Sequence, residues 1–96
     1  MERNLQNLLD EYAFFLQKHP ILAKVSRDKE KMALLKKLKN GGVDEEKAQK
    51  VFWEDYEILL EEDILSRVQS GGKWIVILGF EGLKFLELYE KVGSII

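Results

Sequence analysis

A chain of 96 residues with 46% hydrophobic and 33% charged residues is long enough for one domain with a modest core, and too apolar for a disordered protein. It has no cysteine, which excludes disulfides, thiolate catalysis and thiolate zinc sites and favours a reducing, cytoplasmic location. No apolar run approaches the roughly 20 residues of a membrane-spanning helix, and we expect no signal peptide. The abundance of Glu and Lys and the lack of threonine lean toward a thermophilic source.

Charge is unevenly distributed along the chain, although the net charge is only −2. Between Lys18 and Lys39 there are eight basic and two acidic residues, whereas between Asp44 and Asp63 there are nine acidic and two basic residues. Such asymmetry is typical of a protein that binds a nucleic acid or another protein. It is also expected where two neighbouring helices attract each other and water solvates the surplus charge.

The first segment predicts an amphipathic helix over residues 2–18, because its apolar residues recur at spacings of three and four. These residues are Leu5, Leu8, Leu9, Tyr12, Phe15 and Leu16. Phe14 lies outside this stripe and is expected to fill either a wide buried face or a second contact, such as one with another subunit. Pro20 ends the helix near Lys18, since proline has no amide to donate and displaces the preceding residue from helical geometry. Residues 21–25 are expected to form a single turn whose apolar side chains pack into the core.

Two further helices are predicted in the middle of the chain. The second helix covers residues 27–39, is capped by Ser26 or Asp28 and ends at the glycine pair 41–42. The third helix covers residues 44–63, with Asp44 as its cap and with Val43 packed on Ala48. Its expected apolar side consists of Ala48, Val51, Phe52, Tyr56 and Leu59, flanked by Trp53 and Leu60.

After Asp63 the hydrophobic pattern changes from helical to alternating. It predicts a β-hairpin over residues 64–78 with its turn at residues 70–72. Gly79 breaks the second strand, and helical spacing returns over residues 83–92. The order helix, helix, helix, hairpin, helix predicts an α-rich α+β fold in a single domain of residues 1–96.

The sequence contains no recognisable catalytic or metal-binding constellation. His19 has neither a second histidine nor a cysteine near it in a ligand pattern, so a surface or capping role is expected. None of the serines lies in a nucleophile setting, and the glycine pairs lack the lysine of a phosphate-binding loop. We therefore expect no enzymatic activity, no cofactor and no metal.

The final third of the chain carries a family resemblance. A strand that begins with a basic residue and an aromatic is followed by a corner and by a helix of the form Leu-x-Phe-Leu-x-x-Tyr. The residues concerned are Lys73, Trp74, Gly82, Leu83, Phe85, Leu86 and Tyr89. Over about residues 59–92 the chain thus resembles small archaeal-type winged-helix DNA-binding proteins. The resemblance implies a winged-helix-like fold, in which residues 71–72 form the tip of the wing and the helix 44–63, or its second half, is the recognition helix. It also implies that the protein binds double-stranded DNA and regulates transcription.

The expected recognition helix is acidic, whereas affinity for DNA phosphates comes mainly from Lys and Arg. We therefore expect other parts of the chain to contact DNA. The nucleic-acid-binding residues are therefore predicted to be Arg27, Lys29, Lys36, Lys37, Lys39, Arg67 and Lys73. In the alternative, the same scaffold binds a protein through the acidic helix 44–63 and the aromatics Phe14, Trp53 and Trp74, which includes homodimerisation through the first or last helix. Trp53 and Trp74 are also candidates for the core.

Overall fold

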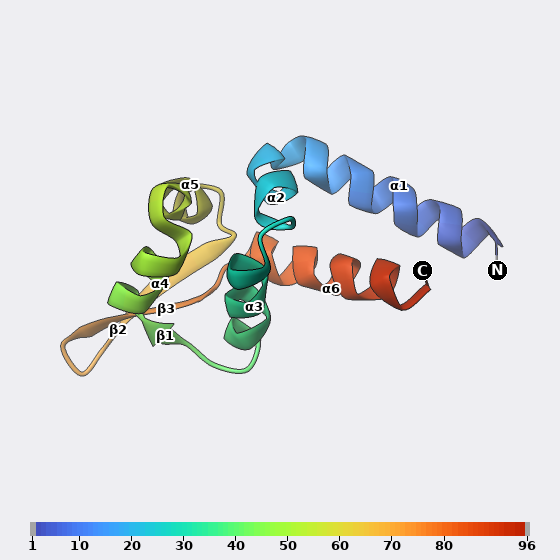
Figure 1. The fold of residues 1–96 in the computed structure, drawn as a ribbon. Coiled ribbons are helices and arrows are strands. Elements are labelled where there is room, and N and C mark those ends of the chain that lie inside the picture. Colours follow the sequence, from blue (N-terminus) through green and yellow to red (C-terminus); the bar gives the residue numbers. More distant parts are fainter. Residues whose placement is uncertain (1, 96) are drawn as a thin grey trace.

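The computed structural model describes residues 2–95 and shows an elongated, helix-rich α+β protein that measures 49 × 23 × 20 Å. Its elements are α1 (Glu2–Lys18), α2 (Pro20–Val25), α3 (Lys29–Leu38), β1 (Val43–Asp44), α4 (Glu45–Phe52), the 3-10 helix η1 (Trp53–Asp55), α5 (Tyr56–Glu61), β2 (Leu65–Ser70), β3 (Lys73–Leu78) and α6 (Phe80–Ile95). Helices α1 and α6 lie side by side at one end, whereas α4, α5 and the strands form the other end, with α2 and α3 between them (Figure 1).

The first three helices follow the predictions closely. Helix α1 ends at Lys18 as expected, and Pro20 is the first residue of the single turn that forms α2. Helix α3 begins two residues later than predicted, because Asp28 caps it and accepts hydrogen bonds from the amides of Glu30 at 3.0 Å and Lys31 at 3.1 Å. Of the two predicted caps, Asp28 is therefore the correct one.

The prediction of one continuous helix over residues 44–63 is wrong. The segment is divided into α4, η1 and α5, and the break lies at Trp53, whose φ of 50° and ψ of −121° no right-handed helix permits. Asp44 occupies the predicted cap position, but its side chain accepts no capping hydrogen bond. Val43 pairs with Val76 in a short strand, β1, that the sequence pattern did not predict.

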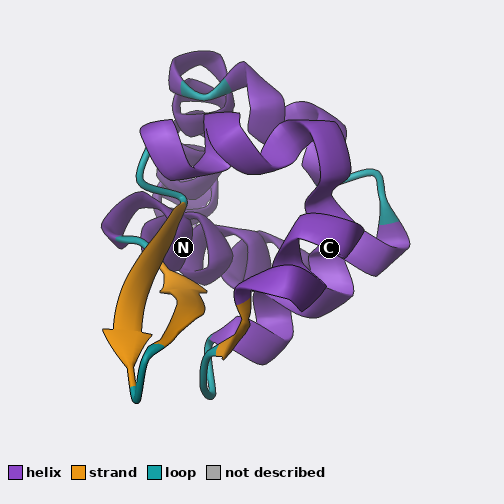
Figure 2. Ribbon diagram, turned by 90° about the vertical axis from the view of Figure 1, so that its left-hand side faces the viewer, coloured by secondary structure: helices purple, strands orange, loops and turns teal. Residues whose placement is uncertain are grey.

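The predicted hairpin is confirmed. Strands β2 and β3 pair from Leu65 opposite Leu78 to Ser70 opposite Lys73, and they are joined at Gly71 and Gly72. Both glycines have positive φ, 59° and 80°, as a tight two-residue hairpin turn requires. Strand β1 adds to the outer side of β3, so that the sheet has the order β1-β3-β2. Figure 2 shows the strands gathered at one side of an otherwise helical molecule.

The hairpin leads into α6 through a close backbone contact. The amide of Gly79 donates to the Ile64 carbonyl at 2.9 Å, and the carbonyl of Asp63 accepts from the amides of Glu81 and Gly82 in the first turn of α6. A Cβ atom on Gly79 would clash with the Asp63 carbonyl, and one on Gly82 would clash with the Ile64 carbonyl. Glycine is thus required where α6 begins, three residues before the predicted start.

The core lies where the helices meet the sheet. Phe52 of α4 and Phe85 of α6 are its largest fully buried side chains, and Val76 of the central strand is also fully buried. The other buried apolar residues are Phe15, Leu22, Val25, Met32, Leu34, Leu35, Leu38, Ala48, Tyr56, Leu59, Ile64, Leu65 and Leu86. Trp53 and Trp74 are absent from this core, so the possibility that they fill it is excluded for both.

Candidate functional site

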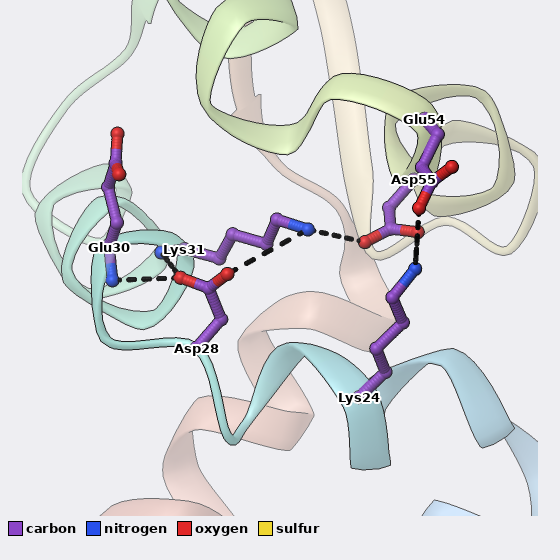
Figure 3. Close-up of polar contacts among 6 residues, drawn as sticks. All are labelled: Lys24, Asp28, Glu30, Lys31, Glu54 and Asp55. Atoms are coloured by element: carbon purple, nitrogen blue, oxygen red, sulfur yellow. Dashed lines mark hydrogen bonds and ion pairs between the residues drawn. The ribbon is translucent and has the colours of Figure 1, made fainter.

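A buried ion-pair network fixes the corner at which α4 turns into α5. The Asp55 side chain, only 3% exposed, accepts hydrogen bonds from the Nζ of Lys31 at 2.7 Å and of Lys24 at 3.0 Å. Figure 3 shows the two lysines reaching this carboxylate from α2 and α3. Burial alone would raise the pKa of Asp55, but the two lysines outweigh it and hold the pKa below its ordinary value. The basic and acidic segments of the sequence therefore do attract each other, as one of the two interpretations predicted.

Trp53 is turned outward at this corner. Trp53 is 76% exposed. In contrast, the nearby aromatic side chains of Phe52 and Tyr56 are in the core, fully buried and 3% exposed respectively. A φ of 50° with a ψ of −121° suits glycine, and a bulky residue adopts it at a cost on the order of 1–3 kcal/mol. A large aromatic side chain is thus held in water, on strained backbone, at a position where it contributes little to the core.

The surface around Trp53 combines aromatic and acidic groups. An open hollow of about 420 Å³ is lined by Gln49, Trp53, Glu54, Tyr56 and Glu57, and we call this the corner surface. Its glutamates are exposed, and Glu54 forms one ion pair, with Lys24 at 3.0 Å. The corner surface is therefore negatively charged, with an exposed indole in its wall.

A chain of polar contacts links the corner surface to the hairpin. The Tyr56 hydroxyl donates to Glu45 at 2.7 Å, and Arg67 of β2 donates to the same carboxylate at 2.9 Å. These two donors lower the pKa of Glu45, while burial and the bond to Glu45 raise the pKa of Tyr56. The Arg67 guanidinium also lies 4.5 Å from the centre of the Trp74 ring. Trp74 is 41% exposed and borders a second, smaller hollow beside α4.

Two of the predicted DNA-binding residues are already paired with carboxylates. Arg67 binds Glu45, and Lys39 forms an ion pair with Glu90 at 2.9 Å. Lys36 lies 5.4 Å from the centre of the Tyr89 ring. The other four predicted residues, all exposed, are Arg27, Lys29, Lys37 and Lys73.

Lys37 has an unexpected neighbour. Its ammonium group lies close enough to that of Lys47, on α4, to lower the pKa of Lys47. Lys47 was not among the predicted DNA-binding residues, because it falls in the acidic segment. Two like charges held together on the surface of α3 and α4 are a local excess of positive potential.

The structure does not bring the three predicted partner-binding aromatics together. Phe14 of α1 is 66% exposed and lines a groove against α6, whereas Trp53 and Trp74 border two separate hollows beside α4 and α5. Because all three have substantial exposure, each is accessible to a partner on its own surface.

His19 is not a surface residue, which corrects the sequence prediction. It is 5% exposed, and its Nδ1 lies 2.6 Å from Glu62 and its Nε2 2.9 Å from Glu81. Its backbone precedes α2, but its side chain makes no capping hydrogen bond. Each ring nitrogen of His19 thus lies within hydrogen-bond distance of a carboxylate oxygen. Lys18 and His19 lower the pKa of Glu81 to about 2.

The described part of the chain was searched for metal-binding groups, membrane-spanning helices and similarity to known proteins. Among the side chains that the structure describes, those of residues 5–94, no group of three or more His, Asp or Glu residues is arranged to hold a metal ion. None of the helices that the structure describes has the length and hydrophobicity to cross a membrane. Comparisons with protein-family models, curated proteins and solved structures found no match to this chain. The surfaces themselves therefore carry the functional argument.

Proposed function

We propose that this protein is a non-catalytic protein-binding module on a winged-helix-like scaffold, and that the corner surface holds a basic segment of its partner. The hairpin beside the α4–α5 corner supports the winged-helix-like scaffold, in which α5 would serve as the recognition helix. An acidic α5 disfavours the groove of DNA and favours a cationic partner.

The carrying observation is the conformation of Trp53. Strained backbone at an exposed aromatic lowers stability without adding to the core, and such strain is found preferentially at functional positions. Tryptophan is also the side chain most enriched at the energetic centres of protein interfaces. A contact with a partner would therefore explain why a tryptophan occupies this position.

The charges beside Trp53 define the chemistry of that partner. Glu54 and Glu57 flank the indole, so an Arg or Lys side chain at this place would gain both a carboxylate and the face of an aromatic ring. A Lys- or Arg-rich peptide segment satisfies both conditions.

Fluorescence anisotropy of a labelled Lys- and Arg-rich peptide tests this proposal. At roughly 50 mM salt we expect saturable binding, which weakens as salt screens the charges. The Trp53→Gly variant should reduce affinity at least fivefold, that is by about 1 kcal/mol. The matched control, Phe14→Ala, removes a comparably exposed aromatic, 66% against 76% for Trp53, from α1 and should leave affinity unchanged. Equal losses in both variants, or no binding at low salt, would contradict the proposal.

A second candidate function, the binding of double-stranded DNA, rests on Lys37 and Lys47, two exposed lysines on the contacting helices α3 and α4, where Lys37 lowers the pKa of Lys47. Phosphate between them would relieve their repulsion and release counterions from the duplex. A labelled duplex should then bind at roughly 50 mM salt, and Lys37→Glu with Lys47→Glu should abolish binding while Lys39→Glu, which breaks an ion pair elsewhere, has a smaller effect. No retardation at low salt would eliminate this function.

A further inference from the structure

Strand β2 is an open edge of the sheet. It is last in the order β1-β3-β2, so in the described chain it pairs with β3 on one side only. Edge strands are usually protected from further pairing by proline, by lysine or by a bulge. The segment Leu65–Ser70 contains no proline or lysine, its register with β3 is continuous through all six residues, and its one charged side chain, Arg67, is held by Glu45. Residues 67–70 are exposed, and the tip of the hairpin projects beyond the helices (Figure 1).

The register of the hairpin determines which backbone groups of β2 point outward. In a hairpin with a two-residue turn, the residues that flank the turn bond to each other, and bonded and non-bonded pairs then alternate. The bond from the Gly79 amide to the Ile64 carbonyl, at 2.9 Å, fits this alternation, because Ile64 lies an even number of positions before Ser70. The amides and carbonyls of Arg67 and Gln69 therefore point away from β3. No backbone group elsewhere in residues 2–95 binds them.

The open edge lies beside the acidic side of α5. The pKa of Arg67 is raised chiefly by its hydrogen bond to Glu45 and to a smaller degree by the charge of Glu57, so Glu57 lies close to β2. Glu61 follows Glu57 by one helical turn and shares its side of α5. Both glutamates are exposed, and neither belongs to an ion pair in the described part of the chain. Because Arg67 is neutralised by Glu45 and Lys73 lies at the far end of the hairpin, the charge beside the edge is negative.

We infer, on the basis of the function proposed above, that the basic partner segment binds as an added strand along β2, with its backbone bonded to Arg67 and Gln69. The outward amides and carbonyls of these two residues match the backbone of an extended chain. Side chains of such a chain alternate between the two faces of the sheet. Those on the face of Arg67 are directed toward α4 and α5, where Glu57 and the hollow beside Trp53 lie. Alternate Lys or Arg residues of the partner thus meet the carboxylates, while the backbone bonds hold the segment in place.

Gln69→Pro tests the added strand, with the labelled Lys- and Arg-rich peptide as probe. Proline is tolerated on an edge strand where the lost amide faces solvent, so the circular dichroism spectrum should match that of the wild type. Peptide affinity at roughly 50 mM salt should fall about fivefold or more. The matched control, Gln69→Ala, keeps the amide and should bind as the wild type does. Equal affinities of Gln69→Pro and wild type would overturn the inference, and so would a wild-type dimer that Gln69→Pro dissociates, because a second copy would then occupy the edge.

Backbone N-methylation of the peptide gives a second readout that leaves the protein unchanged. Methyl groups on alternate amides leave one edge of the peptide free to pair, so affinity should change less than about threefold. Methyl groups on every amide remove all its donors and crowd both edges, so affinity should fall about tenfold or more. If binding survives full methylation but is weakened by Trp53→Gly, the proposed function stands and the added strand is refuted. If the unmodified peptide does not bind at all, both are refuted.

Discussion

Replacing Glu81 with glutamine should destabilise the protein in a manner that depends on pH. The Glu81 carboxylate accepts hydrogen bonds from Lys18 at 2.9 Å and from His19 at 2.9 Å, and its side chain is 15% exposed. These contacts lower its pKa from the ordinary 4.5 to about 2, which corresponds to about 3 kcal/mol of stability at neutral pH. Because the Lys18 side chain is 55% exposed, solvent screening reduces the expected loss in Glu81→Gln to about 2 kcal/mol.

The direction of the pH effect follows from the lowered pKa. The unfolded chain takes up a proton at Glu81 near pH 4.5 while the folded protein resists it until about pH 2. The stabilisation is therefore complete above pH 4.5 and is lost as the pH falls through this interval. Free energies of unfolding in urea should differ by about 2 kcal/mol between wild type and Glu81→Gln at pH 7, and the two should converge toward pH 2.

A matched control separates this effect from the loss of any acidic residue. Glu61 is exposed, so Glu61→Gln should change the free energy of unfolding by less than about 0.5 kcal/mol. If the difference between wild type and Glu81→Gln stays constant from pH 5 to pH 2, then the carboxylate does not contribute through its charge, and the reasoning is refuted.

Three other substitutions test separate features of the fold by urea or thermal unfolding. Asp55→Asn should lower the free energy of unfolding by about 2–4 kcal/mol, because it leaves the buried charge of Lys31 without its partner. Glu54→Gln removes one partner of an exposed ion pair and should lower it by less than about 0.5 kcal/mol. Similar losses for the two variants would contradict the buried network. Gly79→Ala should lower the free energy of unfolding by about 2 kcal/mol or more, because the new Cβ atom would clash with the backbone. Gly93→Ala, in an open helical position, should raise it by about 0.5–1 kcal/mol. A Gly79→Ala variant of unchanged stability would disprove the close approach of the backbone. Trp53→Gly should stabilise the protein by about 1 kcal/mol by relieving strained backbone, and a marked loss of stability would show that the indole belongs to the core.

Features governed by local sequence were predictable. The proline after His19 and the carboxylate of Asp28 determine where helices end and begin, since both act on neighbouring amides. The hairpin was equally predictable, because Gly71 and Gly72 supply the positive φ that its turn needs. In each case the interaction spans only a few residues, so the pattern of residue types is sufficient.

Features governed by distant contacts were not predictable. His19 is buried because its carboxylate partners, Glu62 and Glu81, are 43 and 62 positions away, and nothing around it in the sequence signals them. The break at Trp53 is equally hidden, because the apolar spacing continues through it and a tryptophan is not expected at a positive φ. Exposed aromatics and core aromatics also share the same spacing, so only the fold separates Trp53 from Phe52.

The separation of basic and acidic residues along the sequence affects both the stability and the surface chemistry of the corner between α4 and α5. Part of the basic segment, Lys24 and Lys31, is used internally to hold Asp55, and that network fixes the corner between α4 and α5. At this corner Phe52 and Tyr56 are buried in the core, whereas Trp53 faces solvent. Two other carboxylates of the acidic segment, Glu54 and Glu57, line the hollow beside the exposed indole, and Glu54 is also paired with Lys24. The stability of the corner and the chemistry of its surface therefore arise from the same distribution of charge.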